Sequence, residues 1–212
     1  MKARCSIAVM LALALLLLTN CQPATDEDDN DRGESAETST PLMALTYHIE
    51  KETEEGPLVV ALDTPFLTGE GFRLSVTAHS DGVLYLFNRS ADGTVQRLFP
   101  DPRINRGENS VESNDTVVIP GGESGGWFRF DETAGNEIVY ILFAPEPIEA
   151  LDSFTADSIG AGVFESTLEE IQERQEGLAL RRAVRDNHVL LELEGEDEDA
   201  ILIGTLAFIH QP

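Results

Sequence analysis

A period-two alternation of apolar and polar residues is the feature that most constrains the fold of this 212-residue chain. Between residues 72 and 78, Phe, Leu, Val and Ala alternate with Arg, Ser and Thr, as a strand with one buried face requires. Residues 83–87 and 138–143 are instead apolar throughout, which predicts two strands covered on both faces. The chain is therefore expected to be mainly β.

Further strands are expected where short apolar runs lie between turn signals. Asp92 and Gly93 separate the runs 83–88 and 95–99, and Gly93 can take the positive φ that a hairpin turn demands. The other predicted strands cover residues 42–49, 58–62, 116–119, 127–130, 189–193 and 201–209. About nine or ten short strands favour a sandwich or barrel over alternating strand and helix units, and we predict an antiparallel β-sandwich.

One packed α-helix is predicted at residues 166–186. Ser166 stands three residues before Glu169 in a capping-box pattern, and Leu168, Ile171 and Leu178 recur on one face. We expect this helix to cover one end or face of the sheets. The last two strands are expected to form a hairpin through the acidic loop at residues 195–199.

The N-terminus resembles a bacterial lipoprotein signal. Lys2 and Arg4 precede an apolar run at residues 7–18, which is shorter than the roughly 20 residues that a spanning helix needs, and Cys21 follows. The resemblance implies that the Cys21 thiol takes a diacylglyceryl group, that cleavage occurs before Cys21, and that its new amino end is acylated, palmitate being an expected acyl chain. An ordinary cleaved secretory signal and an uncleaved anchor remain alternatives.

The expected location is the cell envelope. Gln22 follows the cysteine in place of the Asp that is associated with inner-membrane retention, so we expect the outer membrane, on its periplasmic face rather than the cell surface. The predicted division is a signal peptide at residues 1–20, an acidic disordered tether at 21–41 and one β-sandwich domain at 42–212. The acidic cluster in the tether also resembles the surface-export signal of some lipoproteins.

The charge of the chain excludes some partners. Loss of Lys2 and Arg4 with the signal moves the formal charge from -25 to -27. A chain this negative is repelled by phosphate backbones and anionic lipid heads, so we expect no nucleic-acid binding and membrane contact only through the acyl chains on Cys21.

Four short motifs resemble a bacterial domain of unknown function that occurs in cell-envelope proteins. They are Ser-Asp-Gly at residues 80–82, Tyr-Leu at 85–86, Asp-Gly at 92–93 and Leu-Phe-Pro at 98–100. In some chains this domain is fused to caspase-like peptidase or protein-kinase domains. The resemblance implies an accessory or binding module and transfers no catalytic residue.

The folded part offers few groups for chemistry. Its only histidines are His48, His79, His188 and His210, none at a recognised metal-ligand spacing, and it has no cysteine beyond Cys21. No nucleophile elbow and no His-Glu-x-x-His pair is present. We predict solvated or edge histidines, and no metal, cofactor or catalytic residue.

Two loops are candidates for binding. The run 194–199 could attract calcium through its carboxylates, but it lacks the spaced ligands of a calcium loop, which favours a solvated hairpin tip. Trp127 follows the glycine-rich stretch 121–126 and is either a core residue or an exposed anchor for a partner.

The sequence favours a lipid-anchored envelope protein that acts as a non-enzymatic interaction module, an accessory of an envelope or secretion assembly with an unidentified protein partner. An envelope hydrolase with an unrecognised site is one rival hypothesis. A small-molecule or glycan binder that uses the Trp127 loop is the other.

Overall fold

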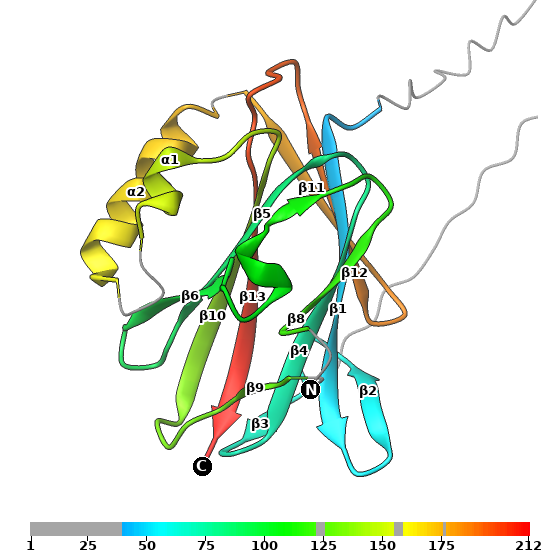
Figure 1. The fold of residues 1–212 in the computed structure, drawn as a ribbon, viewed down its shortest axis with the longest axis vertical. Coiled ribbons are helices and arrows are strands. Elements are labelled where there is room, and N and C mark those ends of the chain that lie inside the picture. The colour runs from blue at the N-terminus through cyan, green and yellow to red at the C-terminus, as the bar shows by residue number, and fades with distance from the viewer. Residues whose placement is uncertain (1–39, 122–125, 155–158, 176) are drawn as a thin grey trace, which may run out of the picture. The chain divides into compact units, whose positions relative to one another are not determined.

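The computed structural model describes residues 40–121, 126–154, 159–175 and 177–212 (Figure 1). The predicted signal peptide, Cys21 and residues 22–39 of the predicted tether lie outside the described residues. Within the described ranges the chain forms thirteen strands, two α-helices and one 3-10 helix, η1 (Asn105–Gly107). The predicted mainly β sandwich with one main helix is confirmed, with more strands than expected.

The first sheet is antiparallel throughout. Its order is β11 (Ala179–Arg185), β12 (His188–Glu194), β1 (Met43–Thr53), β4 (Gly71–Ala78) and β8 (Thr116–Ile119). In addition β2 (Gly56–Val60) pairs with β1, and the short strand β9 (Phe128–Arg129) pairs with β4. β11 therefore lies at one edge of this sheet.

The second sheet has one parallel pairing, between its edge strand β3 and β13. Its order is β3 (Phe66–Leu67), β13 (Leu202–Gln211), β10 (Gly135–Ala144), β5 (Gly82–Arg89) and β6 (Val95–Phe99). The short strand β7 (Ser110–Val111) pairs with β5. β5 and β10 are consequently the central strands of the second sheet.

The main core lies between the two sheets. Alternate residues of β1 point inward, so that Leu45, Tyr47 and Ile49 are buried while the residues between them are partly exposed. From the second sheet, Leu86 and Ile141 are fully buried in the same cluster. Burial of these alternate side chains is the main force that holds the sheets together.

A second core lies between the other face of the second sheet and the helices α1 (Glu149–Asp152) and α2 (Ala161–Glu173), which cover that face (Figure 1). Tyr85 and Phe87 of β5 pack here against Phe164 of α2. The two runs predicted to be covered on both faces are therefore located in β5 and β10, and β5 is buried on both sides as expected. No helix in the described ranges is long and apolar enough to cross a membrane.

The predicted hairpin at Asp92 and Gly93 is present and joins β5 to β6. Gly93 has a φ of 87°, and the amide of Ser90 donates to the carbonyl oxygen of Thr94 at 2.9 Å. The Asp92 side chain accepts a hydrogen bond from the Thr94 amide at 2.8 Å, which stabilises the turn.

The predicted helix at residues 166–186 is wrong at both ends. α2 begins at Ala161, and the Ser166 hydroxyl donates to the Gly162 carbonyl at 2.9 Å, so Ser166 lies inside the helix and does not cap it. The helix ends at Glu173, and residues 179–185 form β11. Seven residue pairs with β12 stabilise that strand, and the two-residue turn between them has positive φ at both positions.

The predicted hairpin of the last two strands is also wrong. β12 pairs with β1 and β11 in the first sheet, whereas β13 pairs with β10 in the second. The acidic loop between them therefore crosses from one sheet to the other. A sequence of two neighbouring strands and a short loop does not distinguish a hairpin from such a crossing, because each strand has the same alternation in both cases.

Candidate binding cleft

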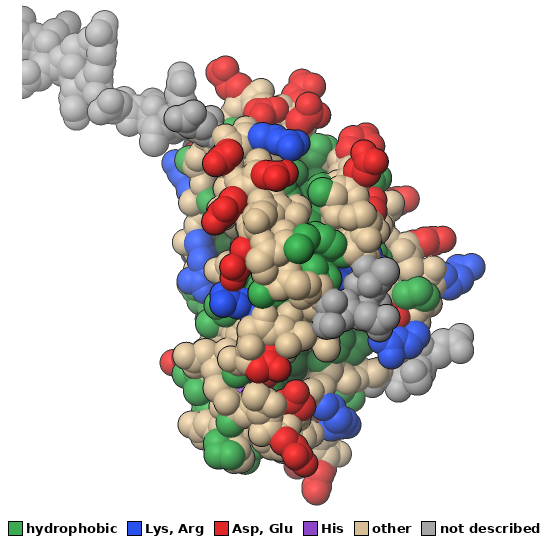
Figure 2. Space-filling view, turned by 90° about the vertical axis from the view of Figure 1, so that its left-hand side faces the viewer, with side chains coloured by type: hydrophobic (Ala, Val, Ile, Leu, Met, Phe, Trp, Pro, Cys, Tyr) green, Lys and Arg blue, Asp and Glu red, His purple; other side chains and the backbone are tan. Residues whose placement is uncertain are grey.

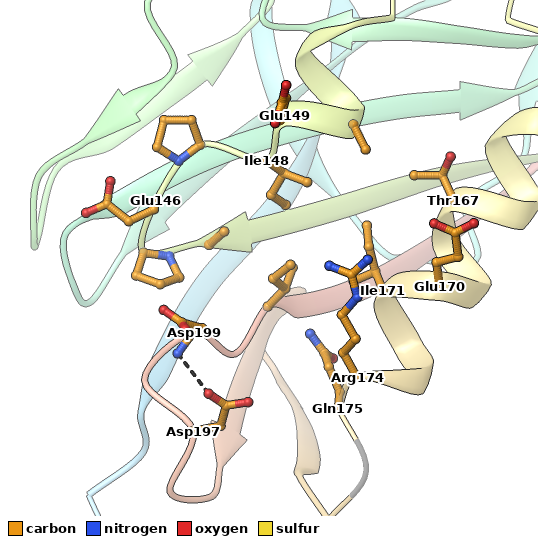
Figure 3. Close-up of a pocket in the computed structure, with 15 residues that line it drawn as sticks. Glu146, Ile148, Glu149, Thr167, Glu170, Ile171, Arg174, Gln175, Asp197 and Asp199 are labelled. Carbon is orange, nitrogen blue, oxygen red and sulfur yellow. Dashed lines mark hydrogen bonds between the residues drawn. The ribbon is translucent and has the colours of Figure 1, made fainter.

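A cleft of about 600 Å³ opens beside the helices, between three segments that are distant in sequence (Figure 3). The first segment is the loop from the end of β10 into α1, at residues 144–150. The second is the C-terminal half of α2 with the two residues after it, and the third is the loop between β12 and β13. The pairing of β10 with β13 brings the first and third segments to the same end of the fold, and α2 joins them by packing on the second sheet.

The lining combines apolar groups with many carboxylates. The apolar lining residues are Ala144, Pro145, Pro147, Ile148, Ala150, Ile171 and Ile201. The acidic ones are Glu146, Glu149, Glu170, Asp197 and Asp199, against a single cation, Arg174. In Figure 3, Arg174 and Gln175 project from the end of α2 into the space between the helix and the loop with the two aspartates.

The hydroxyl of Tyr85 stabilises one wall of the cleft. It accepts a hydrogen bond from the Ile148 amide at 3.0 Å and donates one to the Asp152 carboxylate at 2.9 Å. Burial raises the pKa of this phenol, and the neighbouring Asp152 carboxylate raises it further. A central strand thus fixes both the loop that lines the cleft and the short helix that follows it.

Asp197 orders the opposite wall. Its carboxylate accepts a hydrogen bond from the Asp199 amide at 3.0 Å, and its carbonyl oxygen accepts one from the Ala200 amide at 3.1 Å. Ala200 is buried, so this turn is anchored in the core while the two aspartates remain exposed at the cleft. The run predicted as a solvated hairpin tip therefore contributes two carboxylates to the cleft lining.

The cleft carries an excess of negative charge. Five carboxylates and one guanidinium line it, and Figure 2 shows acidic side chains gathered toward the upper end of the face that carries the helices. Charges of one sign in a concave site with apolar walls raise the local concentration of oppositely charged groups. The arrangement can therefore attract a cation and can contact its apolar part through the aliphatic lining.

Trp127 is half-buried and lies on the first sheet rather than at the cleft. The guanidinium of Arg73 lies over its ring at 4.7 Å from the centroid, within the range of a cation–π interaction. A hollow of about 240 Å³ beside it is lined by Asp101, Arg103 and Phe128 among others. Residues 122–125 of the preceding glycine-rich stretch lie outside the described residues, and the binding role of Trp127 stays a prediction.

Arg73 also belongs to a polar cluster on the exposed face of the first sheet. Partial burial by itself would raise the pKa of the Glu50 carboxyl, but hydrogen bonds from Arg73 and His48 outweigh this effect, so that the pKa lies below its ordinary value. The His48 and His188 rings lie 4.5 Å apart. In the described part of the chain no group of three or more His, Cys, Asp or Glu side chains could hold a metal ion.

The prediction of solvated or edge histidines is wrong for His210. Its side chain is buried, its ring stacks on Phe130 at 5.0 Å, and its Nε2 lies 3.0 Å from the Thr68 hydroxyl. The inward-facing alternation of β13 places His210 on the core side, since Leu206 and Phe208 share that face. His79, in contrast, is exposed and bonds to the Thr46 hydroxyl at 2.7 Å.

The cleft residues carry no sequence motif that could have identified them. Glu170 lies on a helix whose end was wrongly predicted, Arg174 directly follows that helix, and Glu146 lies in a loop with no recognisable spacing to either. The pairing of β10 with β13 and the packing of α2 on the second sheet bring these segments together. Cys21, the predicted lipidation site, lies outside the described residues.

Comparison with known proteins gives one match. Residues 66–147 match the model of a family described as a domain of unknown function, DUF4384. The match runs from β3 to the loop after β10 and agrees with the resemblance to a domain of unknown function that the sequence motifs indicate. No curated protein and no solved structure matches the chain.

Proposed function

We propose that this protein is a lipid-anchored envelope protein whose β-sandwich is a non-enzymatic interaction module. The acyl chains on Cys21 hold it at the periplasmic face of the outer membrane, and the cleft receives a positively charged segment of a partner protein in an envelope or secretion assembly. The observation that carries the proposal is the cleft lining, in which aliphatic side chains lie beside five carboxylates and a single guanidinium.

The chemistry of this lining suits lysine and arginine side chains. Both have an aliphatic stem, which can pack on groups such as Ile148 and Ile171, and a charged end that remains near water and carboxylates. A partially exposed ion pair contributes about 1 kcal/mol or less. Several such pairs together with apolar burial are therefore needed for a useful affinity, and an open cleft of about 600 Å³ provides room for more than one side chain.

The test uses the purified domain and two fluorescent heptapeptides, one alternating Lys with Leu and the other alternating Glu with Leu. We expect the Lys peptide to bind in an anisotropy titration, and its affinity to depend on the cleft carboxylates. The double variant Asp197→Asn/Asp199→Asn should lose about tenfold in affinity, since two carboxylates near a cation are worth on the order of 1 kcal/mol together in a wet site. Asn retains an oxygen for the Asp199 amide hydrogen bond.

Glu196→Gln/Glu198→Gln is the matched control, because these two residues lie in the same loop but do not line the cleft. Both doubles remove two negative charges, so a nonspecific attraction to the acidic chain would weaken equally in both. An equal loss would therefore contradict the cleft as the site, and a loss of Glu-peptide affinity in Asp197→Asn/Asp199→Asn would contradict the sign of the charge.

The anchor is tested separately in cells. Labelled palmitate should mark the wild-type protein and not Cys21→Ser, and the labelled protein should fractionate with outer-membrane markers on a sucrose gradient. Equal labelling of both proteins would remove the lipid anchor, and fractionation with the inner membrane would remove the proposed location.

The hydrolase rival makes a different prediction. Turnover of an ester, peptide or glycan substrate that is abolished by one His or Asp substitution would replace the binding module with an enzyme. The glycan-binding rival rests on the hollow beside Trp127 and would show saturable glycan binding that Trp127→Ala abolishes.

A further inference from the structure

The edge strand β11 carries the densest group of positive charge in the described domain. Its sequence contains Arg181, Arg182 and Arg185 and no acidic residue, in a chain with 39 Asp and Glu against 14 Lys and Arg. All seven of its residues are exposed. The carboxylates of the hairpin lie on β12 and at the turn, so the positive strip is the edge itself.

This edge is open for pairing. β11 pairs with β12 on one side, and no strand among the described residues pairs with its other side. In a hairpin closed by a two-residue turn, the residues beside the turn form a hydrogen-bonded pair and the pairs then alternate. Leu180, Arg182 and Val184 are therefore expected to direct their amide and carbonyl groups away from β12.

The side chains of this edge are also unusually exposed for their type. Leu180, Arg182 and Val184 lie on the side of the sheet that faces the core, since they pair with three buried residues of β12, yet Leu180 and Val184 are 46% and 51% exposed. Arg181 and Arg185 lie on the opposite side. Arg181 contacts Glu194 at 3.2 Å, whereas Arg185 has no ion-pair partner among the described residues.

We infer that β11 binds an extended segment of a partner protein that alternates apolar residues with Asp or Glu and that adds to the sheet as a further strand. The backbone groups of the open edge supply the hydrogen bonds. The apolar residues of the partner cover Leu180, Val184 and the aliphatic stem of Arg182, while its carboxylates face Arg181 and Arg185 on the other side. The site is separate from the cleft and takes a ligand of the opposite charge.

A second copy of this chain is a poor occupant of the same edge. An antiparallel pair of β11 strands centred on Ala183 would place Arg181 of each copy opposite Arg185 of the other, and like charges across a strand pair are destabilising. Charge complementarity therefore selects an acidic strand over self-association.

The test measures binding of two capped heptapeptides, Val-Glu-Val-Glu-Val-Glu-Val and its Lys counterpart, to the whole domain. We expect the Glu peptide to bind with slower amide exchange at Leu180, Arg182 and Val184, and the Lys peptide to leave these three amides unchanged. Arg181→Gln/Arg185→Gln should weaken binding at least tenfold. The control Arg89→Gln/Arg106→Gln removes two exposed or partly exposed guanidiniums elsewhere and should leave binding unchanged.

Val184→Pro tests the backbone contribution, because proline removes an amide that we expect to face away from β12 and is tolerated on sheet edges. It should weaken binding of the Glu peptide and should shift the Tm by no more than a few degrees. If Val184→Pro does not fold, Arg181→Gln/Arg185→Gln tests the inference alone. Slower exchange of the three β11 amides with the Lys peptide, absence of Glu-peptide binding up to millimolar peptide, or dimerisation through β11 would overturn the inference. Absence of binding would mean that the arginines only prevent pairing at this edge, and dimerisation would mean that β11 serves a contact between copies.

Discussion

The hydroxyl of Tyr85 is the most direct link between the central sheet and the cleft, and Tyr85→Phe removes it alone. The ring, which packs in the core beneath the helices, is retained. What is lost is the pair of hydrogen bonds to the Ile148 amide and the Asp152 carboxylate. Asp152 is exposed and can bond to water, whereas the Ile148 amide is partly buried and has no other partner among the described residues.

The expected cost follows from that asymmetry. An unsatisfied buried donor costs about 1–3 kcal/mol, so we expect a loss of about 2 kcal/mol in the free energy of unfolding. For a domain of this size that corresponds to a fall in Tm of roughly 4–8 °C. Urea unfolding followed by circular dichroism measures the first quantity, and a thermal scan measures the second. The cleft should also lose affinity for the Lys-Leu peptide, because the wall that contains Ile148 is no longer fixed.

Tyr140→Phe is the matched control. Tyr140 packs on Phe164 under the same helix, with ring centroids 5.2 Å apart, and its hydroxyl makes no hydrogen bond within the described residues. It should therefore change stability by a few tenths of a kcal/mol. An equal loss in the free energy of unfolding for Tyr85→Phe and Tyr140→Phe would mean that the two hydrogen bonds of Tyr85 do not stabilise the wall.

The pH dependence adds a second check on the same residue. The fold binds the neutral phenol, and its pKa is raised above the ordinary value of 10.0 by burial and by Asp152. The stability that this phenol contributes is therefore fully present below about pH 10 and is lost as the pH rises through the raised pKa. The difference in the free energy of unfolding between wild type and Tyr85→Phe should be constant from pH 7 to 9 and should narrow above pH 10.

Three further changes test other parts of the fold. Leu86→Asp should abolish the cooperative melting transition, since a fully buried side chain is replaced by an unpaired charge at a cost of several kcal/mol, whereas Leu58→Asp, at a 55% exposed position, should melt normally. Asp101→Asn should reduce the fall in the free energy of unfolding, measured with urea, on the acid side of its pH profile. Hydrogen bonds from Arg103 lower the pKa of Asp101 against the effect of its burial, so its contribution to stability is present above about pH 4 and is lost as the pH falls through the lowered pKa. An unchanged fall at acid pH would contradict this. Trp127→Ala should keep a cooperative transition and lose about 2 kcal/mol, roughly half the cost of a buried tryptophan, and complete unfolding would assign the ring to the core.

Much of the sandwich can be predicted from the sequence, because strand alternation and tight turns are local signals. The continuous apolar run in β5 correctly indicates burial on both faces, and Asp92 and Gly93 correctly mark the hairpin. Residues 179–185 show where local signals fail. Ala, Leu and Arg are good helix formers, yet pairing along the whole of β12 outweighs that preference. The dipeptide Asp186-Asn187 is the sequence signal that indicates the turn between β11 and β12.

The cleft could not be predicted in this way. Its acidic residues come from three segments, and the distance between Glu146 and Asp197 in sequence has no relation to their distance in space. The wrong prediction that β12 and β13 form a hairpin also gave no reason to expect the loop between them beside the cleft. A correct assignment of the two strands to different sheets would have been required before Asp197 and Asp199 could be placed beside α2.

The family match and the cleft divide the chain in different ways. The matched range, residues 66–147, covers β3 to β10 and includes only part of the first wall of the cleft, at residues 144–147. The rest of that wall, α2 and the β12–β13 loop come from the part of the chain after the match. Arg174, Asp197 and Asp199 therefore lie outside the matched range, as does the whole of β11. Of the five cleft carboxylates, the matched range contains only Glu146, whereas it contains the central strands β5 and β10, so the two proposed surfaces are built mainly from residues 148–212 on a scaffold that the match includes.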